Sequence, residues 1–175
     1  LAISFSLPTF AQPSYLTFPS DIEWKQKDSV HFHALFRSGL ESFADQTLDY
    51  AEKAHQILDT IFPEGPEKTW IVIADHSDAL NGYALTFPFP NMGIYAFPPT
   101  ASSQLSPLDN WHYSVVLHES VHIRHIYPTG GLWKLLRGVF GSIIAPNGMM
   151  PSHLHEGIAT FLETNYTERG RGKGP

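Results

Sequence analysis

Two histidines and a glutamate with metal-site spacing occupy one apolar run of the chain. His118, Glu119 and His122 spell HExxH inside VVLHESVHIRHI, residues 115–126. On a helix, residues four apart share one face, so the two imidazoles can converge on one metal ion. Glu119 is rotated from His118 by about 100°. Its carboxylate can therefore reach a water on the metal without binding the metal, which is the position of a general base.

The apolar residues around this motif predict a helix that is buried nearly all round. A buried polar group without a partner costs about 2–7 kcal/mol, and a zinc ion satisfies both imidazoles. Catalytic zinc takes three protein ligands and keeps one position for water, so a third ligand is needed. His125 lies on the same stripe as His118, but a straight helix cannot bring both to one ion. We expect His125 beside the site or at the edge of its cleft.

A second helix, expected from residue 151 or 152 to Tyr166, offers the third ligand. Its sequence PSHLHEGIATFLET places Glu156 beside Gly157 and near Ala159. The two small residues would let a neighbouring helix approach closely, so we predict Glu156 as the third ligand. The alternative is a solvated glutamate that favours the helix dipole in the first turn. The predicted core face consists of Leu154, Ile158, Phe161 and Leu162.

The two motifs together resemble the gluzincin metallopeptidases, and specifically the peptidase-MA-like family. In that family the glutamate before the glycine of an EG-x-A helix is the third zinc ligand, which corresponds to Glu156. The resemblance covers about residues 28–174 and includes IVIADHSDALNGYA and FPNMGIYAF. It implies a zincin-like α+β domain, with a small mixed sheet, an edge strand over the cleft, and the HExxH helix packed on the EG-x-A helix.

The resemblance also implies a reaction, the hydrolysis of peptide bonds with Zn²⁺ on His118, His122 and Glu156. Glu119 would take a proton from water and pass it to the leaving amine. The peptide or protein substrate would add as an extra strand along residues 93–97. No aminopeptidase element of the GxMxN type is present, which favours an endopeptidase. Candidates to stabilise the oxyanion are Tyr166, His153 and Tyr127, each of which is better explained by packing.

The remaining elements predict an α+β fold. The strand expected at 92–97 has prolines at both ends, which suits an edge strand because proline cannot donate to a ladder. The other expected elements are a strand at 28–36, a helix at 41–62, a strand at 69–75, a helix at 111–126 and a short helix within 132–143.

Three segments divide the chain. Residues 1–19 resemble the end of a leader with a small residue before the cleavage point, which predicts export to the bacterial periplasm or cell envelope. Residues 20–166 form the predicted catalytic domain, and residues 167–175, with their arginines, a linker or disordered tail. The family resemblance implies that a Tol-type β-propeller follows in a longer protein. No apolar run reaches the length of a membrane span.

Composition argues against some functions, and two alternatives to a peptidase remain. The net charge is −6 and basic residues cluster only at the end of the 175-residue chain, so nucleic-acid binding is not expected. The absence of cysteine excludes thiolate metal sites. One alternative is a catalytically inactive zinc-binding scaffold of the cell envelope, although Glu119 would have no role there. The other is a metal-free binding domain with a chance motif.

Several further polar residues have two interpretations. Glu163 lies on the Glu156 stripe and either hydrogen-bonds a ligand histidine or is an ordinary surface residue. His31 and His33 are expected on an exposed strand face, and His155 on the surface or beside the site. Residues Asp75, Asp78 and Asn81 are expected in turns.

Overall fold

The computed structural model describes residues 20–75, 82–98, 110–168 and 170–173. The predicted leader at 1–19, the turn residues Asp78 and Asn81, and tail residues 169 and 174–175 lie outside the described residues. Within the described residues the chain forms a mixed five-stranded sheet and four α-helices, which confirms the α+β prediction. The strands are β1 (Trp24–Asp28), β2 (Phe32–Arg37), β3 (Thr69–Ala74), β4 (Gly82–Leu85) and β5 (Asn91–Tyr95), and the helices are α1 (Glu41–Ile61), α2 (Trp111–Ile126), α3 (Gly131–Phe140) and α4 (Ser152–Tyr166).

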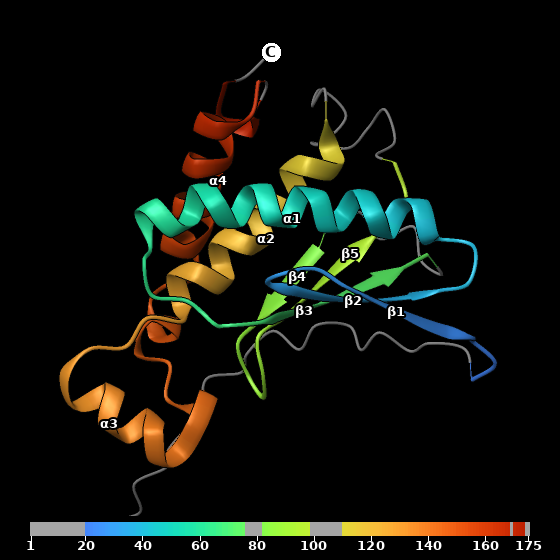
Figure 1. Ribbon diagram of the computed structural model, residues 1–175. Coiled ribbons are helices and arrows are strands. Elements are labelled where there is room, and N and C mark those ends of the chain that lie inside the picture. The colour runs from blue at the N-terminus through green and yellow to red at the C-terminus, as the bar shows by residue number, and fades with distance from the viewer. Residues whose placement is uncertain (1–19, 76–81, 99–109, 169, 174–175) are drawn as a thin grey trace, which may run out of the picture.

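The sheet has the order β1-β2-β3-β5-β4, with α1 and α2 over one face (Figure 1). The three central strands run parallel, and β1 and β4 pair antiparallel at the two edges. Alternate residues of β2 are buried, as a half-covered strand requires. They join α1 and the first half of α2 in one core cluster, whose buried members include Phe36, Leu48, Ile71, Ile94 and Val116.

The prediction that residues 92–97 form the edge strand is wrong. β5 lies between β3 and β4, and β4 is the edge strand on the side of the HExxH motif. Proline affects only the position that it occupies. Pro88, Pro90 and Pro98 all lie outside β5, so every residue of the strand keeps an N–H for the ladders on both sides.

The predicted strand at 28–36 is divided by a turn. Residues 24–28 form β1 and residues 32–37 form β2, and the turn between them is closed by a hydrogen bond from Ser29 N to Phe32 O of 2.9 Å. His33 pairs with Asp28 across this hairpin, while His31 stacks on His55 at 3.7 Å between ring centroids. Neither histidine is therefore on a freely exposed strand face.

The motif helix α2 is buried on almost every side, as its sequence predicts, with twelve of its sixteen residues buried. It packs against α4, where Ala159 and Leu162 meet Leu117 and Val121 in a second core cluster. The predicted core face of α4 is therefore only partly correct. Leu154 and Phe161 are exposed because α4 contacts its neighbour through a narrower stripe, consisting of Ala159, Leu162 and Glu163.

Candidate metal centre

Three side chains from α2 and α4 meet at one point. His118 Nε2 lies 3.3 Å from one carboxylate oxygen of Glu156, and His122 Nε2 lies 3.4 Å from the other. The two Nε2 atoms are 3.2 Å apart. One ligand atom from each residue can be chosen so that all three lie within 4.8 Å of one another. This group could hold a metal ion.

The spacing of these atoms suits a tetrahedral metal. A Zn–N bond of about 2.0–2.1 Å in a tetrahedron places neighbouring ligand atoms about 3.3 Å apart. The two imidazole nitrogens, 3.2 Å apart, lie close to that value, and each has one of the two Glu156 oxygens within 3.4 Å. The donor set, two imidazoles and one carboxylate, is also a common one for zinc. The residues present therefore fit a metal of this type.

The electrostatics keep two of these donors, His122 and Glu156, in forms that bind a cation. Burial lowers the pKa of His122, which therefore stays neutral with a lone pair available. The hydrogen bond with His118 lowers the pKa of Glu156, whose side chain is 61% exposed, so that it stays ionised. Burial disfavours the charged form of His118, but hydrogen bonds with Glu156 and Glu163 outweigh it and raise the pKa of His118.

Glu163 contacts the ring nitrogen of His118 that faces away from Glu156. Its side chain is fully buried, and its Oε2 lies 3.0 Å from His118 Nδ1. Arg171 donates from Nε to the same oxygen at 2.8 Å. Burial would raise the pKa of Glu163, but the hydrogen bonds from His118 and Arg171 outweigh it and the pKa is lowered. Glu163 is therefore a buried partner of His118, one of the three candidate ligands, and not a surface residue.

Glu119 lines the same cavity without joining the ligand group. The cavity has a volume of about 400 Å³ and is lined by all three candidate ligands as well as by β4. Burial raises the pKa of Glu119 to about 7, with Glu156 adding to the rise. Strand β4 passes directly over this side chain, because a Cβ placed on Gly82 would lie only 2.7 Å from Glu119 Cγ.

Among the other polar residues that line the cavity are Tyr83 and Arg171, which the sequence patterns did not assign to the site. Tyr83 comes from β4, where its ring covers Gly93 of the neighbouring strand. Burial raises the pKa of Tyr83 to about 12, so its hydroxyl keeps its proton. Arg171, expected in a linker, lies in a 3₁₀ turn, Arg171–Lys173, that packs against α4. The sequence offers one indication that the backbone is closely packed at these residues, namely a neighbouring glycine: Gly82 before Tyr83 and Gly172 after Arg171.

The other histidines near the motif do not join the ligand group. His125 packs edge-on against His155, which itself lines the cavity, so His125 lies one residue away from the cavity. The three residues weighed as oxyanion donors are not among the cavity-lining residues. His153 and Tyr166 are exposed on α4, and Tyr127 lies under the guanidinium of Arg137.

Comparison of the chain with models of known protein families, with curated proteins and with solved structures gave no match. In the part of the chain that the structure describes, no helix is long and apolar enough to cross a membrane.

Proposed function

We propose that this chain is a zinc-dependent peptidase whose metal is held by His118, His122 and Glu156. The observation that carries the proposal is the convergence of these three side chains, with one ligand atom of each within 4.8 Å of the others and Glu119 beside them in an open cavity. A scaffold that only holds zinc would need the three ligands and a supporting carboxylate. It would have no use for Glu119, a further buried carboxylate that lines the cavity.

Besides the three ligands, Glu119, Tyr83 and Glu163 have roles in this proposal. Zinc, when bound, polarises the scissile carbonyl and makes water acidic enough to lose a proton near neutral pH. Glu119 takes that proton and passes it to the leaving amine. Tyr83, with a hydroxyl that stays protonated, is the better oxyanion donor, because Arg171 is already paired with Glu163. Glu163 holds the proton on His118 Nδ1, so that Nε2 faces the metal.

The substrate proposed is an extended peptide. β4 pairs with β5 on one side only and is the edge of the sheet, and its residues Gly82, Tyr83 and Ala84 line the cavity. A peptide that adds beside β4 would use its backbone groups as ladder partners and lie across the metal group. The edge strand over the cleft is therefore β4, in place of residues 92–97.

The first test is the zinc content of the protein purified without added metal. Wild type is expected to hold about one zinc per chain, and Glu156→Ala to lose most of it because a third ligand is missing. Glu168→Ala is the matched control, since it removes an exposed glutamate just beyond α4. Wild type without zinc, even after incubation with zinc, would exclude the metal site. Full zinc in Glu156→Ala would exclude this third ligand.

The second test separates catalysis from metal binding. Glu119→Gln should keep its zinc and lose peptidase activity on an unstructured protein substrate by at least about a hundredfold, as expected for the removal of a general base. A Glu119→Gln variant with its zinc and full activity would contradict the mechanism. A wild type with zinc and no activity on a panel of peptides would favour the inactive scaffold.

A further inference from the structure

Helix α3 presents apolar side chains to solvent. Leu132, Leu135 and Val139 are 68%, 68% and 71% exposed, and none of the residues of α3 is buried. At about 100° per residue, these three positions together with Trp133 and Phe140 fall within one half of the helix surface. A surface helix normally turns such a face toward the core. Contiguous exposed apolar surface of this kind marks an interaction site.

Arg137, which lies outside the apolar half of α3, contacts the end of α2. The guanidinium of Arg137 stacks over the ring of Tyr127 at 3.8 Å from the ring centroid and donates to the carbonyl oxygen of Tyr127. The contact leaves Leu132, Leu135 and Val139 exposed, while Leu136, in the same half of the helix surface, is half-buried.

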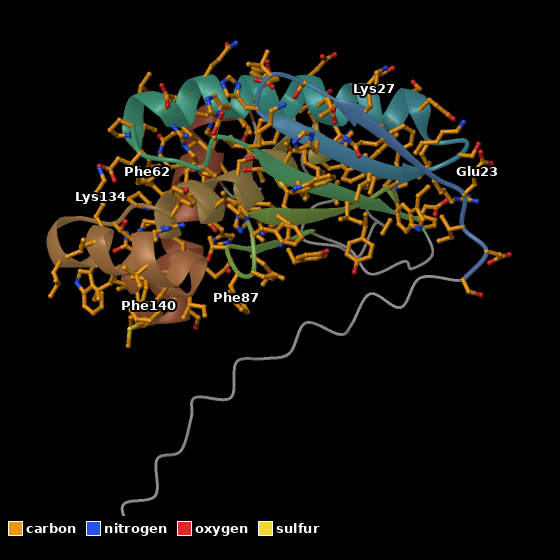
Figure 2. The ribbon with its side chains drawn as sticks, turned by 60° about the horizontal axis from the view of Figure 1, so that its bottom comes forward. Glu23, Lys27, Phe62, Phe87, Lys134 and Phe140 are labelled. Atoms are coloured by element: carbon orange, nitrogen blue, oxygen red, sulfur yellow. The ribbon has the colours of Figure 1, made fainter. Side chains whose placement is uncertain are left out.

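A second apolar element lies at the same end of the molecule. Both views place the hairpin between β4 and β5 at the end occupied by α3, and Figure 2 shows Phe87 and Phe140 along the same side. Phe87 and Phe89 of this hairpin are 55% and 50% exposed. The apolar surface thus extends beyond one helix.

The stretch of the chain that contains α3, residues 120–155, has no acidic residue, although the whole chain is acidic. The chain carries a net charge of −6, yet residues 120–155 contain no Asp or Glu. Within that stretch, α3 carries Lys134 and Arg137 on the side opposite its apolar half. An apolar half with Trp and Phe, and a basic polar side, is the pattern of a helix that lies in the interface of a bilayer. The basic side chains would then lie at the level of the lipid headgroups, where they attract anionic lipids.

We propose that α3, together with the β4–β5 hairpin, docks this protein on the surface of a bilayer that contains anionic phospholipid. The apolar half of α3 enters the boundary between headgroups and acyl chains, and Lys134 and Arg137 stay in the headgroup layer. A second copy of the chain is the alternative occupant of this face, and self-association of the chain would reveal it.

The test is co-sedimentation of the 175-residue chain with vesicles of phosphatidylcholine alone or mixed with phosphatidylglycerol. Wild type should sediment with the mixed vesicles, bind those of phosphatidylcholine more weakly, and dissociate as salt is raised. Val139→Asp should weaken binding by about tenfold or more, since it places a charge where the proposal buries an apolar side chain in the bilayer. Val30→Asp is the matched control, because Val30 is 74% exposed in the β1–β2 turn, away from α3. This variant should bind the vesicles as wild type does.

Three results would overturn the proposal. The first is that wild type sediments with neither kind of vesicle. The second is that Val139→Asp and Val30→Asp bind the mixed vesicles equally. The third is that wild type binds the two kinds of vesicle equally. In the first case, self-association in sedimentation velocity that Val139→Asp abolishes would assign the face to a second copy. Val139 is exposed and does not contact the metal group, so unchanged zinc content and circular dichroism in Val139→Asp confirm that the variant is folded.

Discussion

His118 can bind a metal through Nε2 only while a proton stays on Nδ1. Two groups face Nδ1: the buried carboxylate of Glu163 at 3.0 Å, which accepts from a protonated Nδ1, and Nη2 of Arg171 at 2.5 Å, which also pairs with that carboxylate. The affinity of the proposed metal site should therefore depend on Glu163, which is not one of its ligands.

Glu163→Gln tests this dependence. The amide is a weaker acceptor than the carboxylate and carries no charge, so zinc affinity should fall by about 10–100-fold. Affinity is measured by competition with a chelating dye. Glu168→Gln, the same change at an exposed position, should leave it unchanged. Equal affinities in the two variants would mean that Glu163 serves only to anchor Arg171.

Tyr83→Phe tests the proposed oxyanion donor. Loss of the hydroxyl should lower kcat by about a hundredfold, with zinc content unchanged, because the donor acts mainly on charge that develops in the transition state. Tyr95→Phe is the control, since Tyr95 is on β5 and is not among the residues that line the cavity. If Tyr83→Phe retains the wild-type kcat, the oxyanion donor is another group, and Arg171 is then the next to examine.

At the residue scale, the sequence predicted what depends on spacing within one helix. His118, Glu119 and His122 have a fixed relation on α2, and Glu156 was identified from a motif of equally local kind. Tyr83 and Arg171 could not be predicted in this way. The first depends on which strand is the edge. The second depends on the chain turning back onto α4, where a Cβ at Gly170 would lie 2.2 Å from Thr164 Cα.

At the scale of elements, β4 determines the shape of the cavity by its close approach to α2. Gly82 permits this approach, because any side chain there would meet Glu119 and the carbonyl oxygen of Gly93, both at 2.7 Å. Sequence patterns identify strands more readily than their order. The prolines around β5 suggested an edge, whereas the order is decided by which strand finds a partner on each side.

Gly82→Ala should displace β4 or Glu119 by a few tenths of an ångström or more. We expect peptidase activity to fall by about tenfold or more, since small misplacement of a catalytic group is costly. Zinc content should stay the same, because the ligands come from α2 and α4. Gly130→Ala is the matched control, as a Cβ at Gly130 meets nothing within 4 Å. Equal activity of the two variants would show that the strand adjusts without moving Glu119.

At the scale of the whole molecule, His112 joins the two long helices. It stacks on Phe43 of α1 at 4.0 Å, and its Nε2 lies 2.9 Å from Thr47 Oγ1 in the buried interface. Burial lowers the pKa of His112 from 6.5 to about 4. The folded protein therefore holds a neutral imidazole where the unfolded chain takes up a proton.

The stability of the fold should consequently fall as the solution is acidified. Because the folded pKa lies below the unfolded one, the stabilisation is complete above about pH 6.5 and is lost progressively toward about pH 4. Between pH 7 and pH 5 the contribution of His112 should decrease by about 2 kcal/mol. Urea unfolding of wild type and His112→Gln at both pH values measures it, with a chelator present because metal binding is itself pH-dependent. The other buried histidines are common to both proteins, so the difference isolates His112. Parallel losses of stability in the two proteins would mean that His112 accepts a proton in the folded state without loss of its packing.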